Sequence, residues 1–208
     1  MDLLVTLGRT LGFSLAAGLN LYATVAIIGL AARYDWVELP PQFAIFNNDW
    51  VIGLALLLYA VEFVADKVPW VDTIWDGIHT AVRPLGGALI AVATLGEASP
   101  TAQGVVALLG AMTAGGSHLT KAGTRAFVNA TPEPFSNWIL SLVEDLFVVT
   151  LGYLALQHPL IALVVCVVAL VAVIALVTKI VRVVKGRMRG KGSSQGSGPK
   201  AQRPTPLS

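Results

Sequence analysis

Charged side chains are scarce in this sequence. Asp, Glu, Lys and Arg make up 12% of its 208 residues, whereas a typical soluble domain carries about 25%. Hydrophobic residues account for 55%, and the mean hydropathy is +0.73. The shortage of charge argues against a soluble domain, and we expect no nucleic-acid partner. Several long apolar runs predict an integral membrane protein whose main partner is the lipid bilayer.

Cysteines and catalytic motifs are also nearly absent. The single cysteine, Cys166, lies in an apolar run and cannot form a disulfide within the chain. No Walker loop, dinucleotide fingerprint, HExxH or GxSxG is present. We therefore expect no cofactor and no enzymatic activity. An intramembrane enzyme that uses His79 for acid–base chemistry is a distant third alternative.

Acidic residues are missing from the C-terminal end. From Lys179 onward there are eight Lys or Arg and no acid, whereas residues 1–178 hold six basic and all twelve acidic residues. We expect a transmembrane domain at 1–183 and a basic, disordered tail at 184–208. Basic residues near a membrane exit favour the cytoplasm. Both termini are then predicted to be cytoplasmic, with the chain in the cell inner membrane.

The apolar runs predict an all-α, polytopic transmembrane helix bundle. A spanning helix needs about 20 apolar residues, and about six spans fit that length: 3–31, 50–67, 70–97, 104–126, 135–156 and 160–182. Gly18 and Asn20 interrupt the first run, either as an unwound binding site or as a packing notch. Pro84 predicts a kink in the third span.

A weak internal repeat is visible. With a shift of 65 residues, Pro69 matches Pro134 and Asp72 matches Asn137. We interpret this as two helix–turn–helix units, 50–97 and 105–157. Such symmetry is common in transporters, with sites at the repeat interface. The copies are parallel if each crosses the membrane twice, and inverted if 70–83 is a separate crossing.

Ionisable residues gather on one face of the third span. At 3.6 residues per turn, four of them fall within an arc of roughly 60°: Asp72, Asp76, His79 and Arg83. The second copy carries polar residues on the same arc, and the second span carries acids on one face. An ionised group near the centre of the lipid costs about 2.5–3.5 kcal/mol. These faces are therefore predicted to converge on one interior polar seam.

Three interpretations of the seam stay open. It can be an ion or proton path, formed by Glu62, Asp66, Asp72, Asp76, His79, Asn137, Glu144 and Asp145. It can be structural, with Asp76 paired to Arg83 and with Glu62 or Asp66 paired to a lysine. Alternatively, it can lie in the cytoplasmic interface and simply be hydrated. It can also include a basic pocket for an anionic lipid headgroup. The residues that would form this pocket, or act as charge partners, are Lys67, Arg83, His118, Lys121 and Arg125. The identity of any metal ion is left open.

The first functional hypothesis is a small transporter or channel for a cation or protons. His79 would add a group that titrates between about pH 5 and 8, and Arg83 would favour the charged forms of nearby carboxylates. The alternative is a non-catalytic membrane scaffold or anionic-lipid-binding protein. Small residues on the fourth and sixth spans make a homodimer an additional expectation.

The run LYAVEFVADKVPWVDTIWDGIHTAVRPLGGAL, with AGLNLYATV upstream, resembles a known family. The family comprises bacterial membrane proteins catalogued as a domain of unknown function (four-one-two-six). The similarity covers most of residues 8–180 and leaves out the basic tail. It implies a small, multi-pass inner-membrane fold, and it implies no particular activity.

Overall fold

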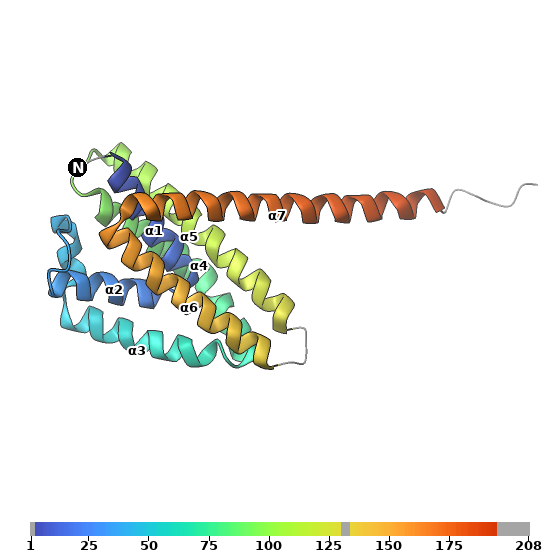
Figure 1. Cartoon of the computed structure of the whole chain (residues 1–208), viewed down its shortest axis with the longest axis horizontal. Coiled ribbons are helices and arrows are strands. Elements are labelled where there is room, and N and C mark those ends of the chain that lie inside the picture. Colours follow the sequence, from blue (N-terminus) through green and yellow to red (C-terminus); the bar gives the residue numbers. More distant parts are fainter. Residues whose placement is uncertain (1–2, 130–133, 195–208) are drawn as a thin grey trace, which may run out of the picture. The chain divides into compact units, whose positions relative to one another are not determined.

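The computed structural model describes residues 3–129 and 134–194, and its regular elements there are helices (Figure 1). They are α1 (Leu3–Leu19), α2 (Leu21–Arg33), the 3-10 helix η1 (Pro41–Phe46), α3 (Asp49–Ala65), α4 (Pro69–Leu95), α5 (Pro100–Asn129), α6 (Pro134–Gln157) and α7 (Pro159–Ser194). The chain up to Val167 forms one compact unit, and the chain from Val168 forms a second. Because the regular elements of the described residues are all helices, the predicted all-α fold class is confirmed.

Proline and asparagine mark where the helices begin. Pro69, Pro100, Pro134 and Pro159 each occupy the first position of a helix, where a missing N–H costs nothing and the fixed φ suits the helix. Asn48 caps α3, since its side chain accepts hydrogen bonds from the next helical N–H groups. The boundaries predicted for the later spans consequently lie close to those of α3 to α6.

The first apolar run is two helices, not one. Asn20 has extended backbone angles and caps α2 by accepting a hydrogen bond from the N–H of Ala23 at 2.9 Å. The chain changes direction at this point (Figure 1). The interruption predicted at Gly18 and Asn20 is present. The single span predicted over 3–31 is two helices of 17 and 13 residues, each shorter than the roughly 20 residues of a typical spanning helix.

Two helices are long and apolar enough to cross a membrane within the described part of the chain, namely Pro69–Leu95 and Phe135–Gln157. The first continues through Pro84 without a break, so residues 70–83 are not a separate element. Shorter apolar helices occupy Leu3–Leu19, Leu21–Arg33 and Pro159–Ala175.

The C-terminal helix is longer than expected. α7 runs to Ser194, so residues 184–194, which we predicted to be disordered, are helical. The rest of the predicted tail, 195–208, lies outside the described residues.

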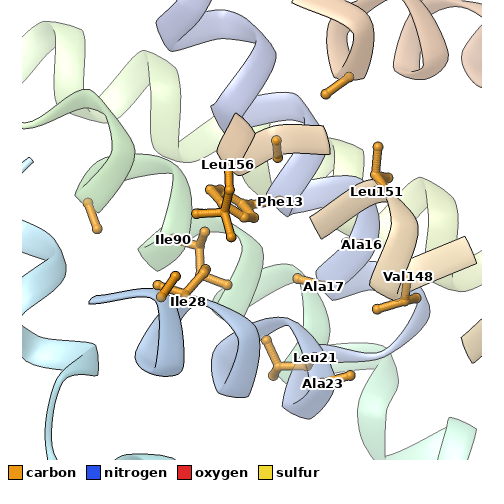
Figure 2. Packing of buried hydrophobic residues seen from close by; sticks show 14 of the residues in the cluster. Phe13, Ala16, Ala17, Leu21, Ala23, Ile28, Ile90, Val148, Leu151 and Leu156 are labelled. Carbon is orange, nitrogen blue, oxygen red and sulfur yellow. The ribbon is translucent and has the colours of Figure 1, made fainter. Parts of the chain in front are cut away.

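Helix α1 occupies the middle of the first unit and packs against α4, α5 and α6. Buried residues such as Phe13, Ile90 and Leu151 form the apolar core (Figure 2). Helices α4 and α5 approach closely where glycines leave room for the other helix. A Cβ on Gly87 or Gly110 would overlap atoms of that helix. Small residues allow this kind of helix contact in membrane bundles, and it brings the polar face of α4 against α5.

Candidate functional site

The interior of the first unit contains charged side chains from four helices. We call the set the buried charge network, and it comprises Glu62, Asp66, Asp72, Asp76, Arg83, Lys121, Arg125 and Glu144. All are buried except Glu144, whose side chain is 13% exposed. Charges are almost never fully buried unless they are paired, so the pairing within the network explains how the fold tolerates it.

Arg83 joins α4 to three other helices. Its Nη2 donates to Oε1 of Glu62 at 2.6 Å, and both side chains are 0% exposed. Its Nη1 lies 2.7 Å from Nδ1 of His118 and donates to the carbonyl of Gly18 at 3.2 Å. The expected ion pair with Asp76 is present, with 3.4 Å between Nη1 and Oδ1.

Lys121 and Arg125 lie four residues apart on α5, on the same face of the helix. They face Glu62 and Asp66, which share a face of α3. The Nζ of Lys121 lies 2.9 Å from Oδ2 of Asp66 and 3.3 Å from Oε1 of Glu62. Two acids on one helix thus meet two bases on another, and the lysine that pairs with them is Lys121.

Arg125 has the most partners in the network. Its guanidinium donates to Oε2 of Glu144 through Nη2 at 2.6 Å and through Nε at 3.1 Å. It also reaches Oδ2 and the carbonyl of Asp66, at 3.0 and 2.7 Å, and Oδ1 of Asn137 at 2.9 Å. Charge-assisted hydrogen bonds of this kind are about twice as strong as neutral ones. The residue therefore ties α3, α5 and α6 together.

Three carboxylates have weaker charge partners, and we call Asp72, Asp76 and Asp145 the surplus carboxylates. Asp72 accepts a hydrogen bond from Asn129 at 2.9 Å, and its ion-pair partner is Nη1 of Arg125 at 3.9 Å. Asp145 accepts from the side chain of Asn20 at 3.3 Å. Within the described chain, one buried oxygen of each of the three accepts no hydrogen bond, which also holds for Glu62 and Asp66, so the longer distances to basic atoms are what set the three apart.

His118 is held as a neutral ring. A guanidinium only donates, so Nδ1 of His118 must accept the hydrogen bond from Arg83. Its proton then lies on Nε2, 3.1 Å from the hydroxyl of Thr80, which itself donates to the carbonyl of Asp76. His118 therefore positions Arg83 against α5.

His79 lies on another side of the network. Its Nδ1 is 2.7 Å from the carbonyl of Trp75 and must donate to it. Its Nε2 is 2.8 Å from the hydroxyl of Tyr22. The side chain is thus engaged by α2 and by its own helix, and its hydrogen bonds do not go to the carboxylates predicted to share a path with it.

Lys67 lies at the edge of the buried charge network, and its side chain is half-buried. Its Nζ donates to the carbonyl of Phe63 at 2.9 Å and to the hydroxyl of Ser141 at 3.4 Å.

Among the described residues, no group of three or more His, Cys, Asp or Glu side chains is arranged to hold a metal ion.

The structure brings together most of the residues predicted to form a seam. Two partners were missed, Tyr22 and Asn129. Asn129 could have been found, because it continues the four-residue spacing of Lys121 and Arg125 on α5. Nothing in the sequence pairs Tyr22 with His79, since they lie on different helices.

A family model described as Domain of unknown function (DUF4126) matches residues 7–179, and the chain belongs to this family. No curated protein and no solved structure matches the chain.

Proposed function

We propose that this member of the DUF4126 family is a small integral membrane protein that moves protons or a small cation. The observation that carries the proposal is an imbalance of charge inside the bundle. Six carboxylates (the network's five and Asp145) face only four basic side chains, namely Arg83, Lys121, Arg125 and the half-buried Lys67. With the histidines neutral, two negative charges are left over.

Excess buried charge is costly. The free energy of transferring an unpaired carboxylate out of water is so unfavourable that such a group takes up a proton or binds a cation instead. Glu62, Asp66 and Glu144 are matched by three basic residues at short distance. The surplus carboxylates are therefore the groups that would accept the proton or cation.

The outer surface supports a membrane location. Large apolar side chains on α3, α5 and α6 are exposed, for example Leu57 at 60%, Met112 at 65% and Leu146 at 67%. Soluble monomers rarely expose large contiguous apolar surfaces. An apolar exterior around a charged interior is the arrangement that hydrocarbon requires. We keep the prediction of an inner-membrane protein with its basic C-terminal end in the cytoplasm and its N-terminus on the same side, which reporter fusions to each terminus would test.

Contacts of the α3–α4 turn with the end of α5 and the beginning of α6 support a parallel repeat. Asn129, at the end of α5, donates to the carbonyl of Pro69, and Trp138 of α6 donates to the carbonyl of Lys67. The turn between α3 and α4 thus lies near the end of α5 and the beginning of α6. Parallel repeats with a site at their interface are a transporter architecture.

Ion flux tests the proposal. The full-length protein is reconstituted into liposomes that contain a pH-sensitive dye, and a proton, Na⁺ or K⁺ gradient is applied with valinomycin or a protonophore to compensate charge. We expect flux above that of protein-free liposomes. Asp76→Asn should abolish it, because this isosteric change removes one surplus charge. Glu97→Gln is the control, since Glu97 is exposed.

Two results count against transport. One is a wild-type rate equal to that of empty liposomes under every gradient. The other is an undiminished rate in Asp76→Asn. Both variants must elute and melt as folded proteins, so that a loss of flux is not a loss of structure.

The alternative function is a non-transporting scaffold, in which the network only fixes helix register. The close pairing of Glu62, Asp66 and Glu144 with bases favours it. The lipid-headgroup version has less support, because Arg83, Lys121 and Arg125 are buried among carboxylates. Native mass spectrometry that finds a retained anionic lipid, lost in Lys121→Gln, would support that version. A homodimer remains a prediction for the same measurement.

A further inference from the structure

A small pocket lies between α4 and α5, beside the buried charge network. Its volume is about 160 Å³, and the lining residues that matter here are Asp72, Thr73, Asp76, Gly77, Thr80 and Arg125. A water molecule occupies about 30 Å³ in the liquid, so the pocket has room for about five waters. Drug-sized ligands need about 300–1,000 Å³. The occupant must be small.

Two of the surplus carboxylates line this pocket. Asp72 is 0% and Asp76 is 5% exposed, and because they lie four residues apart on α4 they share one face. Within the described chain, Oδ1 of each accepts no hydrogen bond. A buried, unsatisfied carboxylate oxygen lowers its free energy by meeting a cation. The pocket is therefore lined by two buried carboxylates whose negative charge a small cation would offset.

The neighbouring arginines pair only at long distance with these carboxylates. Nη1 of Arg125 lies 3.9 Å from Oδ1 of Asp72, whereas Nη2 of the same side chain is 2.6 Å from Glu144. Nη1 of Arg83 lies 3.4 Å from Oδ1 of Asp76, whereas its Nη2 is 2.6 Å from Glu62. Both arginines are held more tightly by other acids, which leaves negative charge at the pocket.

The chemistry of the pocket limits the class of ligand that it can bind. Carboxylate and hydroxyl oxygens suit hard cations rather than soft metals. Divalent ions such as Ca²⁺ take six to eight oxygens, commonly from several carboxylates, and only two carboxylates line this pocket. We propose that the pocket binds one monovalent alkali cation, Na⁺ or K⁺, between Asp72 and Asp76, with threonine hydroxyls and water completing its shell. This inference rests on the proposed function and names its substrate class.

Cation-dependent stability tests the inference. The full-length protein in detergent, at fixed pH and ionic strength, is melted with NaCl or KCl in place of choline chloride, and tryptophan fluorescence reports Tm. We expect a saturable rise in Tm with Na⁺ or K⁺ and none with choline, because methyl groups shield its charge from close coordination by carboxylate oxygens. Asp72→Asn and Asp76→Asn should abolish the rise. Asp145→Asn should retain it, since Asp145 lies outside the pocket.

A steric variant keeps the test valid should the charge variants fail to fold. A Cβ on Gly77 meets no atom within 4 Å, and the same holds for Gly123 of α5, which does not line the pocket. Gly77→Leu should fill the pocket and abolish the saturable rise in Tm, whereas Gly123→Leu should leave it intact.

Equal responses to choline and alkali cations would overturn the inference, as would a rise that persists in Gly77→Leu. Failure here is distinguishable from failure of the proposed function. Proton flux without alkali binding leaves transport standing and removes only the cation site. Saturable alkali binding without any flux removes transport and leaves a structural ion.

Discussion

Replacing Arg125 by Met should destabilise the protein strongly. The substitution keeps an unbranched side chain and removes five hydrogen bonds to Glu144, Asp66 and Asn137. Hydrogen bonds to charged groups contribute about 1.5–3 kcal/mol each, but Arg125 itself had to be desolvated, so their sum overstates the net effect. Breaking a buried ion pair by removing one partner costs about 3–5 kcal/mol, and we expect a loss within that range.

A surface ion pair supplies the matched control. Nη2 of Arg33 lies 2.6 Å from Oδ1 of Asp49, the same distance as between Arg125 and Glu144, but the two side chains are 31% and 87% exposed. Exposed pairs contribute about 0–1 kcal/mol. Arg33→Met should therefore cost little, and the comparison sets a buried arginine with several partners against an exposed one at the same ion-pair distance.

The assay is reversible unfolding in mixed micelles with increasing SDS, followed by tryptophan fluorescence. Adding Glu144→Gln to Arg125→Met should recover about 1–3 kcal/mol, because the double variant no longer buries an unpaired carboxylate at that position. The reasoning fails if Arg125→Met costs no more than Arg33→Met, or if the second substitution makes the loss larger.

Three further predictions concern the helix break. Gly18→Ala should lower the free energy of unfolding by about 1–3 kcal/mol, because its Cβ would overlap Oγ of Ser117. A Cβ on Gly123 meets open space, so Gly123→Ala should not destabilise the protein. Equal losses of stability for the two variants in the SDS titration would contradict this packing. Asn20→Ala should cost about 1 kcal/mol through the lost cap. Asn20→Asp keeps a capping oxygen but places a carboxylate beside Asp145. The loss in free energy of unfolding relative to wild type should therefore be larger at pH 8 than at pH 5. An equal loss at both pH values would refute the contact between residue 20 and Asp145.

The polar stripe of α4 could be read from the sequence because helical periodicity and the cost of charge in lipid both act locally. Spacing alone put Asp72 and Asp76 on one inward face. The partners could not be read in the same way. Glu62 pairs with Lys121 of α5 because of how α3 and α5 are rotated and staggered, and hydropathy carries no information on either quantity.

The break in the first apolar run shows the same limit. Asn20 signals a helix start because its side chain can cap the following N–H groups, so the interruption was predictable. The change of direction that follows was not, because α1 and α2 are both apolar and their sequences read as one span. His79 likewise lies on the predicted arc, but its partner Tyr22 comes from α2, whose path the sequence did not define.

Every proposal depends on the apolar exterior being in contact with hydrocarbon. The direct measurement is labelling of single cysteines by a membrane-impermeant maleimide, in a Cys166→Ala background, in sealed and in permeabilised liposomes. We predict that Leu57→Cys, Met112→Cys and Leu146→Cys stay unlabelled in both, whereas the exposed loop position Glu97→Cys reacts in at least the permeabilised ones. Labelling of the three helix positions as fast as Glu97→Cys would contradict the account.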